Sequence, residues 1–219
     1  VLNIGGVIET ASGKELPDAI LCAWQAGQEG GNSVADVLSG KASPSGKLTM
    51  TFPVAFEDAA SSANFPIDEK ANIDISNSGE STTNNKNVDY TNYEEDIYVG
   101  YRYFDSFDKA VSYPFGYGLS YTTFEYTSAS ASVKDGIVTV AVDVENTGAF
   151  AGKEVVEVYV KAPNAQAENK PEHELKGFAK TAEIAPGDVF GVNIQFALAD
   201  LASFDEEASA WVVAEGDYE

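Results

Sequence analysis

Apolar and polar residues alternate through the second half of the chain. From about Phe124 onward, short segments place an apolar side chain at every second position, and Gly, Pro and Asn residues separate them. The segments with this pattern are residues 136–144, 154–160, 176–180, 189–198 and 210–213. Short strands at regular spacing predict an antiparallel β-sandwich over residues 124–219, of immunoglobulin or fibronectin type III shape.

The first part of the chain has a different pattern. Apolar runs that predict strands lie at residues 1–4, 19–24 and 48–53. A glycine-rich loop at residues 26–31 leads into residues 32–38, whose apolar positions recur at helical spacing, with Asn32 or Ser33 as the N-cap. Residues 1–56 are therefore predicted to form part of an α/β, Rossmann-like sandwich domain, which makes the whole chain an α+β protein in two parts.

The glycine-rich loop is the candidate ligand site of this first part. In open α/β sheets, ligands bind at the carboxyl ends of the strands, and the order strand, loop, helix puts this loop at such an end. Gln28 and Glu29 supply an amide and a carboxylate there. The alternative is that both residues only fill the turn and bind backbone groups.

A polar segment and an aromatic junction connect the two parts, and together they occupy residues 57–123. Residues 57–90 are rich in Ser, Asn and Asp and predict a long loop. Its side-chain oxygen atoms could bind a hard cation, which is a minor alternative. The run at residues 113–126 alternates aromatic residues with glycines. Aromatic rings supply buried area and glycine permits close backbone approach, so this run predicts a packed junction and not a free linker.

Charge and residue counts exclude several kinds of protein. The formal net charge of −22 excludes a nucleic-acid or anionic-membrane partner, since both need clustered Lys and Arg. No apolar run approaches the roughly 20 residues of a membrane helix. The single cysteine, Cys22, is expected to be a small buried apolar residue, and the single histidine, His173, leaves no material for a histidine triad or a multi-histidine metal site. Any catalysis must then use carboxylates.

A series of motifs resembles glycoside hydrolase family 3, with the nearest likeness to bacterial β-glucosidases. The motifs occur in the family's order over nearly the whole chain, at residues 24–31, 35–40, 44–48, 51–53, 98–105, 114–124, 146–148, 152–156 and 174–178. The resemblance implies the end of an α/β sandwich domain followed by most of a fibronectin type III-like domain. Trp24, Gln28 and Glu29 lie in the first motif and are the candidate substrate-binding residues.

The resemblance also implies what the chain lacks. Family members of this type use a barrel Asp as nucleophile and a Glu of the α/β sandwich domain as acid/base, and neither motif occurs here. Retaining hydrolysis needs both carboxylates, so the resemblance implies no catalytic residue in this chain and a barrel-bearing portion as its partner. Both ends of the chain resemble segments that lie inside the domains of family members. No cofactor or metal is expected, the substrate is expected to be a β-glucoside or, second, a β-xyloside, and the acidic surface favours a periplasmic or secreted protein.

Two other functions stay open from the residues alone. A stand-alone carbohydrate-binding module would use exposed aromatic faces, and the candidates are Trp24, Tyr93, Tyr98, Tyr101 and Tyr103. A purely structural module with no ligand is equally compatible with the missing carboxylates. Binding of cello-oligosaccharides by the chain separates the first of these from the second.

Overall fold

The computed structural model describes residues 18–63, 93–163, 165 and 169–219. The helices are α2 (Gly30–Leu38) and α3 (Tyr101–Ser106), with short 3-10 turns η1 (Phe56–Asp58), η2 (Ala60–Ala63) and η3 (Leu198–Leu201). The strands are β1 (Phe52–Pro53), β2 (Val111–Tyr113), β3 (Phe124–Lys134), β4 (Ile137–Asn146), β5 (Val155–Val160), β6 (Glu174–Lys180), β7 (Val189–Ala197), β8 (Ser203–Asp205) and β9 (Ala210–Val212). None of the helices within these ranges has the length and apolar character needed to cross a membrane.

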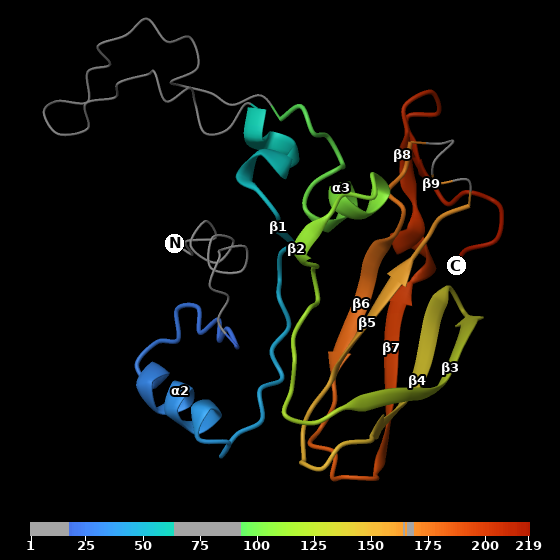
Figure 1. Ribbon diagram of the computed structural model, residues 1–219. Helices are drawn as coiled ribbons and strands as arrows, with labels where there is room; N and C mark the ends of the chain where they lie inside the picture. The colour runs from blue at the N-terminus through green and yellow to red at the C-terminus, as the bar shows by residue number, and fades with distance from the viewer. Residues whose placement is uncertain (1–17, 64–92, 164, 166–168) are drawn as a thin grey trace, which may run out of the picture.

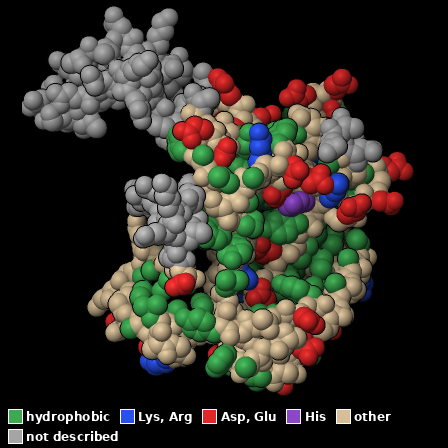
Figure 2. All heavy atoms as spheres, in the orientation of Figure 1, with side chains coloured by type: hydrophobic (Ala, Val, Ile, Leu, Met, Phe, Trp, Pro, Cys, Tyr) green, Lys and Arg blue, Asp and Glu red, His purple; other side chains and the backbone are tan. Residues whose placement is uncertain are grey.

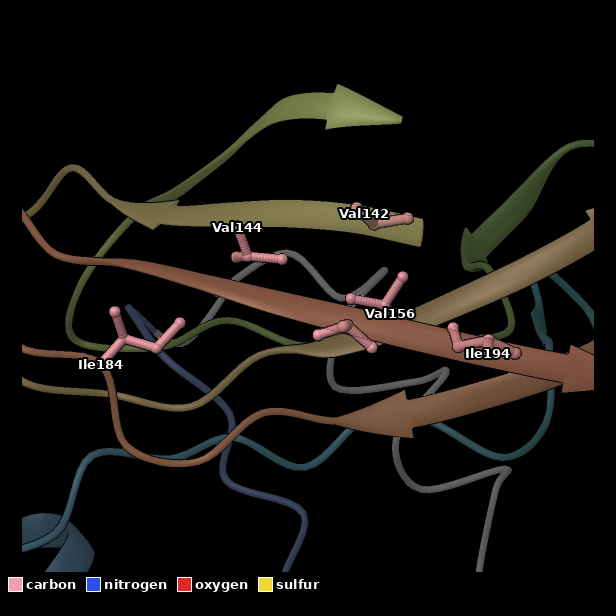
Figure 3. Close-up of a cluster of buried hydrophobic side chains, with 6 residues drawn as sticks. Val142, Val144, Val156, Ile184 and Ile194 are labelled. Atoms are coloured by element: carbon pink, nitrogen blue, oxygen red, sulfur yellow. The ribbon is translucent and has the colours of Figure 1, made fainter. Parts of the chain in front are cut away.

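The second half forms the predicted antiparallel sandwich. One sheet has the order β3-β4-β7, a second consists of β5 and β6, and β8 pairs with β9 as a separate hairpin. Every second side chain of β4 and β7 faces inward, as the alternating sequence requires, and these side chains meet those of β5. The resulting core contains Val142, Val144, Val156, Ile184, Val192 and Ile194 (Figure 3).

The first part is connected to this sandwich by extended chain. Figure 1 shows α2 set apart from the sandwich, with the segments that carry β1 and β2 running between them. These segments pair through Phe52 and Tyr113, and their ladder is extended by hydrogen bonds from Leu48 N to Tyr117 O (2.8 Å) and from Gly116 N to Leu48 O (2.8 Å). Backbone hydrogen bonds thus join the segment before and in β1 to the segment in and after β2.

Two glycines of the junction show why the sequence alternates aromatic and glycine residues there. Gly116 has φ +76°, and a Cβ at this position would collide with the carboxylate of Glu157. A Cβ at Gly118 would collide with the backbone oxygen of Gly46. The backbone angle favours glycine at position 116, where the flexible Glu157 side chain could move, and the close approach of backbone requires glycine at position 118.

Several local predictions for the first part were wrong. Residues 19–24 form no strand, and Leu21 and Trp24 are 44% and 43% exposed. A strand exists only beside a paired neighbour, and among the described residues none pairs with this run. The strand predicted at 48–53 is confined to β1, and the helix begins at Gly30, so its N-cap is Glu29 and not Asn32 or Ser33. The run at residues 1–4, and residues 64–90 of the predicted long loop that offered cation ligands, lie outside the described residues.

Candidate functional site

The glycine-rich loop presents Gln28 and Glu29 at the N-terminus of α2. A turn closes where Gly30 N donates to Gly27 O (3.2 Å), and Ser33 N then donates to Glu29 O (2.9 Å) to begin the helix. Gln28 and Glu29 are both exposed. The Glu29 carboxylate accepts a hydrogen bond of 2.6 Å from the side-chain amide of Asn32, and a negative charge at a helix N-terminus is electrostatically favourable. The structure thus holds this carboxylate in a defined place while leaving it open to solvent.

Trp24 lies at the start of the same loop. Its φ of +49° is uncommon for a residue with a bulky side chain, and its indole is 43% exposed. Within the described part of the chain, no hydrogen bond or ring contact joins Trp24 to Gln28 or Glu29. The three predicted residues therefore share one exposed loop, where they offer an apolar ring face, an amide and a carboxylate. These are the groups that a neutral sugar can stack on and hydrogen-bond to.

A second constellation joins α3 to the segment just before and at the start of β6. Side chains on one face of α3 contact four consecutive residues of that segment in reverse order. Tyr101 Oη accepts from Leu175 N (2.8 Å), Arg102 pairs with Glu174 (2.9 Å), Asp105 Oδ2 contacts His173 Nε2 (3.0 Å), and Ser106 Oγ accepts from Glu172 N (2.8 Å). Positions i, i+1, i+4 and i+5 share a helix face, so a single short helix can make all four contacts.

His173 lies at the centre of this group of contacts between α3 and residues 172–175, which we call the α3 clamp. Its ring stacks on Tyr101 at 6.0 Å between centroids and meets the edge of Tyr159 at 5.0 Å. Burial, followed by the hydrogen bond to Glu157 and the charge of that residue, raises the pKa of the Tyr159 hydroxyl above its ordinary value. The sequence showed only that His173 lies among charged residues. Its structural role depends on contacts with residues about 70 positions earlier, for which the local pattern carried no signal.

The contribution of Asp105 to the stability of the chain is expected to depend on pH. Partial burial raises the pKa of its carboxyl above the ordinary value, and the opposing charge and hydrogen bond of His173 offset this only in part. A carboxyl with a raised folded pKa contributes stability that is present below its unfolded pKa and lost as the pH rises through the folded pKa. Asp105→Asn is therefore expected to gain stability relative to the wild-type chain as the pH rises from about 3 to about 6, a range around the ordinary aspartate pKa of about 3.9.

Urea denaturation of the chain at a series of pH values measures this difference. Asp108→Asn is the matched control, because Asp108 is an exposed aspartate just after the same helix. A stability difference between Asp105→Asn and wild type that stays constant across this pH range would contradict the prediction.

A third constellation joins the turn before β1 to the start of β5. Lys47 Nζ lies 2.9 Å from Glu154 Oε1 and donates to Gly118 O at 3.0 Å. The side chains of Lys47 and Glu154 are only 18% and 12% exposed. Burial, and then the charge of Glu154, raise the pKa of the neighbouring Tyr126 to about 12. This ion pair explains why a Gly-Lys-Leu motif and a Lys-Glu-Val motif occur together, because their charged residues neutralise each other across the junction.

The remaining predicted aromatic residues have different environments. Tyr103 packs on Phe104 and Phe107, while Tyr98 packs on Phe107 and donates to Asn169 Oδ1 at 3.0 Å. Tyr93 is 84% exposed. Tyr101 accepts a hydrogen bond from Leu175 N and stacks on His173, so its ring is not a free stacking face. The expectation of a fully buried Cys22 was wrong, since this residue is half-buried.

The surface carries the acidic character of the sequence. Figure 2 shows Asp and Glu side chains over the visible face, with few Lys or Arg among them. Among the described residues, no group of three or more His, Cys, Asp or Glu side chains could hold a metal ion. The exposed loop of Trp24, Gln28 and Glu29 thus remains the candidate ligand site.

Family models match both parts of this architecture. A model described as the glycosyl hydrolase family 3 C-terminal domain matches residues 1–121, and one described as a fibronectin type III-like domain matches residues 154–219. A glycosidase α/β portion joined to a fibronectin-like sandwich is the class of protein that the fold defines. The chain belongs to glycosyl hydrolase family 3.

Individual relatives extend this match. The chain is 42% identical to β-glucosidase B of Emericella nidulans over 100% of its own length and 25% of that protein. It is 38% identical to an exo-α-(1→6)-L-arabinopyranosidase of Bifidobacterium longum, over 100% of the chain and 26% of that protein. The structure of β-glucosidase 3B from Thermotoga neapolitana in complex with glucose is similar, with TM-score 0.75 and 46% identity over 89% of this chain and 25% of that one. The chain thus spans about a quarter of the length of these relatives.

Proposed function

We propose that this chain is the C-terminal portion of a retaining β-glucosidase, which removes terminal β-linked glucose from β-glucosides. The observation that carries the proposal is the match of the whole chain, at 42% identity, to a quarter of a protein named a β-glucosidase, with residues 1–121 matching the family 3 C-terminal domain. A structural neighbour solved with glucose supports it. The two catalytic carboxylates, about 5–5.5 Å apart in retaining enzymes, are then supplied by a barrel-bearing portion and by the upstream part of the α/β domain.

Within this enzyme, the chain contributes substrate contacts and interdomain support. Trp24, Gln28 and Glu29 contact the sugar, and their shared exposure on one loop supports this role. The chain is divided into the end of the α/β sandwich domain at residues 1–56, a loop and junction at residues 57–123, and the fibronectin type III-like domain at residues 124–219. Exposed apolar side chains outside the sandwich, namely Ile20, Leu21, Leu38, Val54 and Phe56, offer a surface that the barrel-bearing portion covers.

The substrate is tested with the complete enzyme on 4-nitrophenyl glycosides. The β-glucoside is expected to have the highest kcat/KM, and the β-xyloside is the second candidate. An α-L-arabinopyranoside belongs in the same series, because one relative with 38% identity is named an arabinopyranosidase. A kcat/KM for either pentoside above that for the β-glucoside would overturn the proposed substrate. The chain alone is expected to hydrolyse none of them.

Replacement of Glu29 tests the proposed site. Glu29→Gln in the complete enzyme is expected to raise KM for the β-glucoside about tenfold, because a hydrogen bond from a sugar hydroxyl to a charged group contributes about 1.5–3 kcal/mol. Steady-state kinetics with the 4-nitrophenyl β-glucoside provide the measurement. Asp36→Asn is the matched control, since Asp36 lies on the same helix and, among the described residues, its carboxylate pairs with the exposed Lys41. Equal KM values for Glu29→Gln and Asp36→Asn would assign Glu29 to a structural role.

A carbohydrate-binding module is the second candidate function. The strongly exposed ring of Tyr93, with 84% of its surface accessible, favours it. Calorimetry of the chain with cellotetraose distinguishes the two functions: binding by the chain alone supports the module, and its absence supports a supporting portion of the enzyme.

A further inference from the structure

Among the described residues, one side-chain hydrogen bond links helix α2 to the second half of the chain. No residue of α2 is fully buried. The other hydrogen bonds of this helix are local, such as those from Asn32 to Glu29 and from Lys41 to Asp36. Within the described residues, the only hydrogen bond to α2 from beyond residue 63 comes from Tyr121, whose hydroxyl donates to Val37 O at 2.9 Å.

Tyr121 is itself firmly attached. Its backbone N donates to Ser43 Oγ (3.2 Å), and Ser43 Oγ shares a hydrogen bond of 2.8 Å with Ser120 Oγ. The next residue, Thr122, is buried and donates from Oγ1 to Asn146 Oδ1 at 2.6 Å. Asn146 is the fully buried last residue of β4. Tyr121 is therefore attached, through the adjacent Thr122, to the end of the sandwich.

The contact of Tyr121 and the candidate sugar site lie at opposite ends of α2. Val37 belongs to the last turn of the helix, and Glu29 is its N-cap. A helix of nine residues is about 13 Å long and behaves as a rigid rod over that length. Fixing one end of the rod restricts the position of the other, so the sandwich and the loop are physically connected through Tyr121.

We infer that Tyr121 is a positioning residue for sugar binding. Its hydroxyl fixes the C-terminal end of α2 to the end of the sandwich and thereby sets the place of Gln28 and Glu29. The inference rests on the proposed function, because it assigns the effect to the loop that is proposed to contact the sugar. It gives the fibronectin type III-like domain a role in substrate affinity without a sugar contact of its own.

Tyr121→Phe in the complete enzyme tests this inference, because it removes only the hydroxyl. KM for 4-nitrophenyl β-glucoside is expected to rise about two- to tenfold, the range that corresponds to the loss of one ordinary hydrogen bond, while kcat stays within about twofold. Amide hydrogen exchange over residues 29–38, measured by mass spectrometry, is expected to become faster. Tyr218→Phe is the matched control, since its hydroxyl donates to Ala214 O far from α2 in the sequence, and it should change neither quantity.

The double variant distinguishes this inference from the proposed function. In the Glu29→Gln background, Tyr121→Phe is expected to change KM less than about twofold, because its effect acts through Glu29. Glu29→Gln with an unchanged KM overturns the proposed sugar contact. Tyr121→Phe with wild-type exchange over residues 29–38 overturns the positioning role, whatever Glu29→Gln does.

Discussion

Asn146→Ala is expected to lower the free energy of unfolding of the chain by about 4 kcal/mol, because several buried polar groups lose their partner and each costs about 1–3 kcal/mol. Asn146 is 0% exposed. Its amide nitrogen donates to Phe150 O and Ile184 O, both at 2.8 Å. Its side-chain oxygen accepts from Thr122 Oγ1 (2.6 Å) and Gly148 N (3.1 Å). Urea denaturation followed by circular dichroism is the measurement.

Asn193→Ala is the matched control for this prediction. Asn193 lies on β7 in the same sandwich with an exposed side chain, so its removal should change the free energy of unfolding by less than about 0.5 kcal/mol. Asn146→Asp keeps the accepting oxygen but replaces the donating amide by a carboxylate, and it should also be strongly destabilised. Equal stability of Asn146→Ala and Asn193→Ala would show that Asn146 does not organise this end of the sandwich.

Glu154→Leu is expected to lower the free energy of unfolding by about 3 kcal/mol, because removing one partner of a buried ion pair leaves the other charge uncompensated. Lys47, the partner, is only 18% exposed and keeps a single acceptor, Gly118 O. The double variant Lys47→Met with Glu154→Leu should recover most of the loss, because an apolar pair of similar volume leaves no unpaired charge. Urea denaturation of both variants and the wild-type chain provides the comparison.

Lys41→Ala controls for the general effect of breaking an ion pair. Lys41 and Asp36 are 2.9 Å apart, but their side chains are 74% and 40% exposed, and such pairs contribute about 0–1 kcal/mol. If Glu154→Leu is no more destabilised than Lys41→Ala, the Lys47–Glu154 pair does not hold the two parts of the chain together.

The sandwich was predictable from the sequence because strand alternation is a local property. Residues 189–198 alternate because one face of β7 is buried, and the structure places the strand at Val189–Ala197. For the opposite reason, the strand predicted at residues 19–24 does not form, and the one predicted at 48–53 is confined to Phe52–Pro53. An apolar run predicts burial, but only a paired neighbour makes it a strand, and the sequence does not say which neighbour is present.

The candidate loop was predictable as a loop, and its exact form was not. Its glycines indicated the turn, yet the helix begins at Gly30 and Glu29 becomes the N-cap with Asn32 as its hydrogen-bond partner. Asn32 was expected to cap the helix through its own side chain. Asn is a preferred N-cap residue and Glu is not, yet the helix begins after Glu29 without a side-chain cap hydrogen bond, because its start depends on backbone angles that neighbouring residues alone do not determine.

By itself, the sequence determined the two-part architecture, the acidic surface, the lack of a histidine-based site and the family, because periodicity, composition and ordered motifs need no knowledge of long-range contacts. Tertiary structure alone decided which distant residues meet: His173 with Asp105, Lys47 with Glu154, and Tyr121 with Val37. Such pairs are selected by the path of the chain through space, and the energy of each contact exists only once its partners are brought together.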